Sequence, residues 1–167
     1  LPEELLSDQA NGLKAIQSAI EVCAEFGAQV VGLGAVTAMI GGQGKRIAQS
    51  SPIPVTSGNT LTTYAAVETV ELLLSKNTDT KRRICLIGPP GPVANGLLRV
   101  LAHRGHALQV YSPTVPKPLG NLMEKLNEQT HGHISVTDDL EETLGGDTVL
   151  VAASSTGGRI KLSECPP

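Results

Sequence analysis

Between residues 83 and 153, short apolar runs alternate with segments of helical periodicity, and this alternation constrains the fold more than any other feature. The apolar runs cover residues 83–88, 107–111, 133–136 and 147–153, and helical patterns cover 93–104, 119–129 and a short stretch ending near Gly145. Strands alternating with helices of this length form a parallel sheet with right-handed crossovers. We therefore predict an α/β fold, a Rossmann-like parallel sheet with helices on both faces.

The N-terminal part predicts a smaller α/β segment that precedes this sheet. Apolar residues recur at helical spacing between Leu13 and Ala24. A buried strand is predicted at 29–34, a flexible turn or loop at 41–44, and a short edge strand at 53–56, where proline cannot donate to a ladder. A linking helix is expected over about 61–75, followed by a polar linker. The predicted domains are 1–78, a partial substrate domain with the linking helix, and 79–167, a dinucleotide-binding domain truncated at its C-terminus.

Composition excludes several classes of function. The 167 residues have a formal net charge of −3, and the aromatic residues are one Phe and two Tyr with no Trp. Such a chain offers no basic surface and few stacking platforms, so no nucleic-acid partner is expected. No apolar run reaches the length of a transmembrane helix.

The cysteines and the chain ends give two further expectations. Cys23, Cys85 and Cys165 are too unevenly spaced for a disulfide framework or a metal site, so we expect no metal and a cytoplasmic location. The chain begins at Leu1 rather than at Met and stops at Pro167, which predicts a fragment of a longer protein.

A glycine-rich segment stands where the first strand of the second part turns into a helix. This is the position of the dinucleotide-binding turn, in which the helix N-terminus faces the pyrophosphate. Three prolines in the segment lack an N–H, so a rigid turn that binds nothing is the alternative. The predicted cofactor contacts in this turn are Gly88, Pro89, Pro90, Gly91, Pro92, Val93 and Ala94.

Two further loops follow strands at the same sheet edge, where open α/β sheets bind their ligands. The second strand ends without an acidic residue, and the hydroxyls of Ser112 and Thr114, with Lys117 nearby, favour NADP(H) over NAD(H), which stays possible. The last strand ends in small residues that would allow a nicotinamide ring to approach, namely Ala153, Ser154 and Ser155. The alternative is that both are ordinary surface loops.

A substrate cleft is predicted at the start of the linking helix. One Thr or Asn suffices to cap a helix, so a surplus of hydroxyl and amide groups there suggests polar recognition, with capping and a solvated turn as the alternative. The loop after the first strand is expected to face the same cleft. The predicted cleft residues are Gly34, Thr37, Ser57, Gly58, Asn59, Thr60 and Tyr64. No catalytic residue is assigned.

These motifs resemble those of the cyanobacterial-type long-chain acyl-[acyl-carrier-protein] reductases over nearly the whole chain. Residues 56–64, Thr-Ser-Gly-Asn-Thr-Leu-Thr-Thr-Tyr, are the most specific match, and Gly88, Gly91 and Ala94 fall on the family's glycine-rich turn. The resemblance implies an NADP(H)-dependent oxidoreductase that reduces a fatty acyl thioester to an aldehyde, with a small-molecule or acyl-carrier thioester as substrate. None of the three cysteines matches the family's nucleophile.

Two alternatives stay open. A shikimate-dehydrogenase-like NADP reductase also has an Asn-Thr segment on the helix that enters its nucleotide domain, although Leu61 stands where that family has Asp. A non-catalytic Rossmann-like module that binds a nucleotide or a protein is the second. An open sheet edge makes a homodimer possible.

Overall fold

The structure is a computed structural model that describes residues 7–76, 83–130, 133–144 and 148–154. Contacts within the chain divide it into two compact units, Leu1–Asn59 and Thr60–Pro167. We call them unit 1 and unit 2. This division assigns the linking helix to unit 2, and the domain boundary predicted after residue 78 stays a prediction.

Unit 2 contains a four-stranded sheet in which every pair of neighbouring strands is parallel. The strands lie in the order β5-β4-β3-β6, with Ile84 opposite Leu108 in β4 and opposite Val149 in β6. The strands are β3 (Arg83–Ile87), β4 (Leu108–Tyr111), β5 (Ile134–Thr137) and β6 (Thr148–Ala152). This arrangement confirms the predicted fold class.

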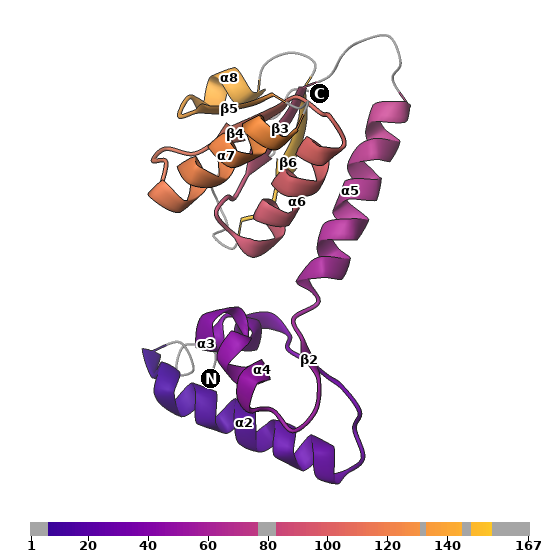
Figure 1. Ribbon diagram of the computed structural model, residues 1–167, viewed down its shortest axis with the longest axis vertical. Helices are drawn as coiled ribbons and strands as arrows, with labels where there is room; N and C mark the ends of the chain where they lie inside the picture. Colours follow the sequence, from indigo (N-terminus) through magenta and orange to yellow (C-terminus); the bar gives the residue numbers. More distant parts are fainter. Residues whose placement is uncertain (1–6, 77–82, 131–132, 145–147, 155–167) are drawn as a thin grey trace. The chain divides into compact units, whose positions relative to one another are not determined.

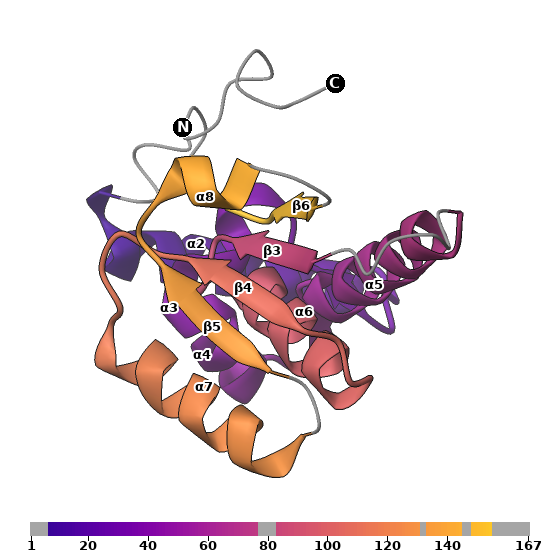
Figure 2. The same ribbon diagram turned by 90° about the horizontal axis from the view of Figure 1, so that it is seen from above.

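Helices cover both faces of this sheet. Figure 2 shows α6 (Pro92–His103) and α7 (Lys117–Gln129) on one side and α8 (Leu140–Leu144) on the other. Because side chains alternate along a strand, Ile84 and Leu86 of β3 join the core beneath α6 and α7. The same core contains Leu97, Leu101 and Leu126, all of them buried.

Helix α5 (Asn59–Ser75) packs against α6 through a close approach. A Cβ atom added to Gly96 would lie 2.7 Å from Thr63 Oγ1, so only glycine leaves room for this contact. At the other end of the contact, Arg104 forms ion pairs with Glu68 and Glu71 at 3.1 and 3.2 Å. These contacts, together with Val67 and Val70 in the core, hold α5 on unit 2.

Unit 1 is smaller, and its sheet consists of the two short parallel strands β1 (Val31–Gly32) and β2 (Val55–Thr56). Its long helix α2 (Gln9–Glu25) begins after Asp8, whose carboxylate accepts a hydrogen bond from the Asn11 N–H at 3.1 Å. The core consists of five fully or nearly buried side chains, Ile16, Ile20, Leu33, Ile40 and Ile47.

Between β1 and β2 the chain forms three short helical turns, η1 (Ala35–Ala38), α3 (Ile40–Gln43) and α4 (Lys45–Ser50), seen in Figure 1 next to α2. Sequence periodicity did not predict η1 or α4, because helices this short contain less than two turns of pattern. The strands also proved shorter than predicted, since residues 29–30, 33–34 and 53–54 lie outside them.

The segment predicted as a flexible turn or loop at 41–44 is a left-handed turn. Gly41, Gly42, Gln43 and Gly44 have φ angles of 66, 68, 61 and 79°, respectively. Glycine adopts this conformation freely, whereas a residue with a Cβ atom is disfavoured in it by about 1–2 kcal/mol. Gln43 is therefore the strained member of the turn.

Candidate functional site

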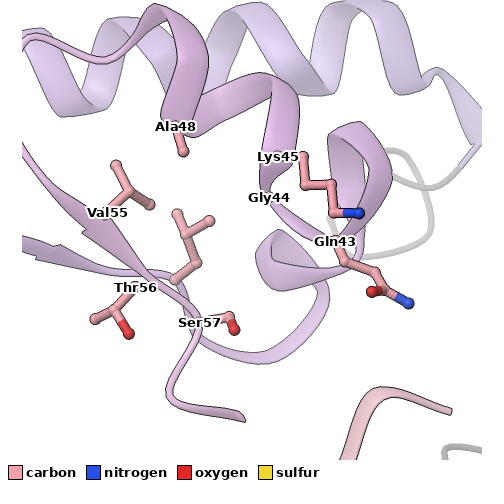
Figure 3. Close-up of a pocket in the computed structure, with 8 residues that line it drawn as sticks. Gln43, Gly44, Lys45, Ala48, Val55, Thr56 and Ser57 are labelled. Atoms are coloured by element: carbon pink, nitrogen blue, oxygen red, sulfur yellow. The ribbon is translucent and has the colours of Figure 1, made fainter. Parts of the chain in front are cut away.

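A pocket of about 270 Å³ lies in unit 1 at the carboxyl ends of β1 and β2. The strand side of the pocket is formed by Val55, Thr56 and Ser57, and the helical side by Gln43, Gly44 and Lys45, as Figure 3 shows. Leu33 and Ala48 complete the lining. The carboxyl edge of a parallel sheet is where α/β proteins usually bind ligands, because chain loops diverge there.

The pocket contains four polar side chains and one formal charge. The charge is the ammonium group of Lys45, and no carboxylate is among the eight lining residues. The Thr56 hydroxyl oxygen accepts a hydrogen bond from the Gly58 N–H at 3.2 Å, which orients this hydroxyl. With Ser57 and the Gln43 amide, the pocket offers several hydrogen-bond donors next to a positive charge.

The strained residue of the left-handed turn lies in this same pocket. Gln43 has a φ angle of 61°, lines the cavity and precedes Gly44, whose own φ of 79° leads the chain into α4. Gly44 is buried, and a Cβ atom added to it would come within 3.1 Å of Leu33 Cδ1. Gln43 is the one residue of this turn that is not glycine, although glycine would adopt its conformation without strain. Strained non-glycine residues concentrate at functional sites.

Of the residues predicted for the substrate cleft, Ser57 lines this pocket. Thr37 donates its hydroxyl to the Gly34 carbonyl at 2.6 Å, a local bond at the start of η1. Gly58 has a φ of 73° and provides the turn into α5. Thr60 and Tyr64 belong to unit 2, where Tyr64 is 60% exposed on α5. Ligand contacts by these residues, and by Asn59, stay a prediction.

Sequence patterns alone do not single out Gln43 and Lys45. The signal that could have found them is the run Gly-Gly-Gln-Gly-Lys at 41–45, in which glycines surround a single amide before a cation. The glycine content of this run predicts only flexibility. Turns with positive φ need glycines as much as flexible loops do, so glycine content alone does not distinguish the two.

The turn predicted to hold a pyrophosphate has few donors to offer. Pro89, Pro90 and Pro92 carry no N–H, and the Gly91 N–H donates to the Gly88 carbonyl at 2.8 Å. Residues 89–92 therefore present no unused backbone N–H to a ligand, whereas Val93 and Ala94 lie in the first turn of α6, where backbone N–H groups have no acceptor within the helix. The Asn95 amide donates to the Pro90 carbonyl at 3.2 Å and closes the turn.

Gly88 has a structural role in this turn. Its φ angle is 125°, and a Cβ atom added to it would lie 2.4 Å from the Ala153 carbonyl oxygen. The Ala153 N–H in turn donates to the Ile87 carbonyl at 2.8 Å. The predicted neighbours Gly88, Ala153 and Ser154 thus do meet at the ends of β3 and β6, and what they bind stays a prediction.

The loop after β4 is closed by its own hydrogen bonds. Ser112, which is buried, donates its hydroxyl to the Thr114 carbonyl at 2.5 Å, and its N–H donates to the Thr137 carbonyl. Lys117 is exposed at the start of α7. Ser155, predicted beside the nicotinamide, lies outside the described residues.

Cys85 is a core residue of β3 that α8 covers. Burial raises the pKa of its thiol to about 11, against smaller opposing effects of the Tyr111 backbone and the Thr143 hydroxyl. A thiol this far from ionisation is neither a nucleophile nor a metal ligand at neutral pH. Cys23 is exposed on α2, and within the described residues no three His, Cys, Asp or Glu side chains gather as metal ligands.

Solved structures similar to this chain include transcarbamylases. An N-acetyl-L-ornithine transcarbamylase aligns with 81% of this chain and 48% of its own at 18% identity and a TM-score of 0.51. The ornithine transcarbamoylase of Giardia lamblia aligns with 84% of this chain and 51% of its own at 16% identity and a TM-score of 0.52. At such identities the similarity establishes an α/β transcarbamylase-type fold and nothing about the reaction.

One curated relative matches along nearly the whole chain. Aminotransferase PigE of Serratia sp. strain ATCC 39006 is 34% identical over 167 residues, which are 99% of this chain and 20% of the relative. The chain thus spans about a fifth of the length of the curated relative it matches. No protein family model matches the chain.

These comparisons overturn the predicted identity. The relative is named as an aminotransferase and the structural neighbours are transcarbamylases, so the resemblance to acyl-[acyl-carrier-protein] reductases is wrong, and so is the NADP(H)-dependent oxidoreductase derived from it. The alternatives, a shikimate-dehydrogenase-like reductase and a non-catalytic module, are not supported either. The predicted cofactors NADP(H) and NAD(H) are therefore wrong as well. The lack of free backbone N–H groups at residues 89–92 gives a physical reason, because a pyrophosphate needs such donors.

The similarity to an aminotransferase suggests pyridoxal phosphate as a cofactor. The residues that line the pocket do not fit this cofactor. Proteins hold it by a lysine Schiff base together with an Asp or Arg at the pyridine nitrogen. The eight lining residues include Lys45 but neither Asp nor Arg. We therefore assign the pocket no pyridoxal phosphate chemistry.

Proposed function

We propose that this chain is a substrate-binding part of a transferase, and that the pocket of unit 1 holds a small anionic group such as a carboxylate or a phosphate. The proposal depends on the observation that Lys45 and the strained residue Gln43 line the same pocket. The identity with PigE supports a role in an amino-group-transferring enzyme, of which this chain matches 20% of the length.

Charge favours an anion. Lys45 is the one charged residue of the lining, and its ammonium group, the Gln43 amide and the hydroxyls of Thr56 and Ser57 are all hydrogen-bond donors. Hydrogen bonds to a charged group contribute about 1.5–3 kcal/mol each. A cation bound here would meet Lys45 without any carboxylate in the lining to offset its charge.

Size favours a small molecule. Pockets that hold drug-sized ligands and cofactors measure roughly 300–1,000 Å³, and the pocket falls just below this range at about 270 Å³. A carboxylic acid of a few carbons or a phosphate fits such a volume, whereas a dinucleotide does not. The small-molecule substrate predicted from the sequence agrees with this size.

The experiment is a titration followed by NMR of the backbone amides. Phosphate, acetate and a short 2-oxo acid are each added at concentrations that detect roughly millimolar affinity, and shifts at Gly44, Lys45 and Ser57 report the site. Lys45→Gln keeps much of the stem of the side chain and removes its charge. We expect at least one anion to saturate and this variant to bind it about tenfold more weakly.

The matched control is Arg46→Gln, which removes a neighbouring charge of the same helix that does not line the pocket. Equal losses in both variants would mean that the anion responds only to net charge, and the proposal would be abandoned. It would also be abandoned if none of the three anions saturates.

Location and assembly remain predictions. Among the described residues no helix is long and apolar enough to cross a bilayer. The cytoplasmic location expected from the cysteines and the possible homodimer are retained as proposals, to be tested by fractionation and by sedimentation of the purified chain.

A further inference from the structure

A second cavity of unit 1, separate from the pocket above, has no assigned ligand. It measures about 490 Å³ and is lined by Gln9, Ala10, Leu13, Lys14, Gln17, Gly41 and Arg46. Five of these residues lie on α2 and the other two lie in α3 and α4, so the cavity is a groove between α2 and the short helices. These helices are neighbours in Figure 1.

The floor of the groove is apolar and depends on a glycine. A Cβ atom added to Gly41 would lie 3.1 Å from Leu13 Cδ1 and 3.3 Å from Arg46 Cβ. Gly41 itself has a φ of 66° and is buried. Gly41 thus packs closely on Leu13 because it has no side chain, and Ala10 adds a small wall on the α2 side.

One wall of the groove is fixed by a hydrogen bond between helices. The Gln17 amide donates to the hydroxyl of Ser50, the last residue of α4, at 2.5 Å, and this hydroxyl donates to the Arg46 carbonyl at 3.1 Å. The first bond joins α2 to α4 across 33 residues of sequence. The groove is therefore a formed feature of unit 1 and does not need a ligand to hold its walls together.

Both charged residues of the groove are cations. Lys14 and Arg46 stand on opposite walls, and no carboxylate of the described residues forms an ion pair with either of them. Their methylene stems add apolar surface while their charged ends reach solvent. An apolar floor beneath two cations complements a molecule with an apolar body and an acidic group.

We propose that this groove is a second binding site, and that it takes an apolar organic anion whose body packs on Leu13 and Gly41 and whose acidic group meets Lys14 and Arg46. Its volume lies within the range of roughly 300–1,000 Å³ found for small-molecule sites. This site differs from the pocket at Lys45 in size and in the polarity of its floor, although Lys45 and Arg46 are adjacent on α4.

The probe is 2-naphthoate, and its neutral control is 2-naphthamide, which has almost the same shape without the charge. Amide shifts along α2 and at Gly41 locate the binding. We expect saturable binding of the naphthoate, with the naphthamide about tenfold weaker or worse, as for the loss of a charge-assisted contact. Equal binding of the two compounds, or no saturation by naphthoate, would overturn the proposal.

Three variants separate this site from the first. Lys14→Gln and Arg46→Gln should each weaken naphthoate and leave the small-anion site unchanged, and Lys45→Gln should do the reverse. Ala10→Phe fills the groove from an exposed position and should abolish naphthoate binding without loss of the fold. If naphthoate binding ignores Lys14, Arg46 and the filled groove, the assignment fails, whatever the outcome at Lys45.

Discussion

The two units show how differently the same α/β principle works in a large core and in a small one. Among the described residues, the main core cluster of unit 2 contains sixteen buried hydrophobic residues from its sheet and from α5, α6 and α7, whereas that of unit 1 contains five around a sheet of two short strands. A small core buries few side chains, so the conformation of unit 1 depends more on irregular turns than on side-chain packing. The small-anion pocket and the groove on α2 both lie in unit 1, next to its left-handed turn.

The difference also concerns where glycine is required. In unit 2, Gly88 and Gly96 allow two backbone segments or two helices to come close together. In unit 1, the glycines at 41–44 set a chain direction in a left-handed turn, and Gly44 and Gly41 each line one of the two cavities. Unit 2 thus uses glycine for close packing, and unit 1 uses it mainly for a left-handed turn that borders both cavities. Each of the following predictions tests one side of this comparison.

The largest effect is expected for Gly88→Ala. The new Cβ atom would meet backbone atoms of Ala153 at 2.4 Å in a φ region that is almost restricted to glycine. We expect a loss of about 3–5 kcal/mol in the free energy of unfolding of unit 2, measured by urea denaturation. Gly105→Ala is the control, because its φ is 82° but nothing lies within 4 Å, and it should cost only about 1 kcal/mol.

The close contact between Gly96 and Thr63 predicts that Gly96→Ala changes the stability of unit 2 in opposite directions in two backgrounds. Gly96→Ala alone forces a methyl group against Thr63 and should destabilise unit 2 by roughly 1–2 kcal/mol. In a Thr63→Ala background the clash is gone, so the same substitution should stabilise α6 by up to about 1 kcal/mol through helix propensity. A double-mutant cycle in urea measures both values. Additive effects would show that the two residues do not limit the approach of α5.

Gln43→Gly tests whether unit 1 retains strain for function. Glycine removes the left-handed penalty at φ 61° but adds chain entropy to the unfolded state, so we expect a net gain of about 0.5–1 kcal/mol. Hydrogen exchange of α2 amides would report this gain. The same variant should bind the small anion more weakly. A variant that is more stable and binds as well would remove Gln43 from the site.

The smallest effect concerns Glu71, which pairs with His106 at 2.9 Å and with Arg104. Burial by itself would raise the pKa of this carboxyl, but hydrogen bonds from His106 and Arg104 and their charges outweigh it and lower the pKa. The unfolded state therefore takes up the proton first as pH falls. The stabilisation is present above the ordinary glutamate pKa of about 4.3 and is lost as pH falls through the lowered pKa of the folded state.

Glu71→Gln should accordingly cost less than about 1 kcal/mol at neutral pH, as exposed ion pairs do. The difference from the unsubstituted chain should shrink as pH falls through the lowered pKa of Glu71. Thermal unfolding between neutral and acidic pH measures it. A difference that stays constant with pH would assign the effect of the substitution to packing rather than to the ion pairs.

Sequence by itself determined the α/β class, the four strands of unit 2 and the helices between them. Runs such as 83–87 and 107–111 are apolar on both faces, and only a parallel sheet covered on both sides buries such strands. The identity of the protein did not follow, because glycine-rich turns and hydroxyl-rich caps serve several families of this fold.

Tertiary structure alone decided what the glycines do and where the cavities lie. The run that contains Gly41, Gln43 and Gly44 predicted a flexible turn or loop. In the structure these residues have positive φ angles, and the turn they form leads into α4, where Lys45 and Arg46 line two different cavities. Likewise, Gly88 resembled a phosphate-binding glycine, and its neighbour in space is the Ala153 carbonyl, 65 positions away in the sequence. A local sequence pattern indicates which backbone conformation is preferred. A binding site depends on which atoms from distant parts of the sequence fill the space beside that backbone.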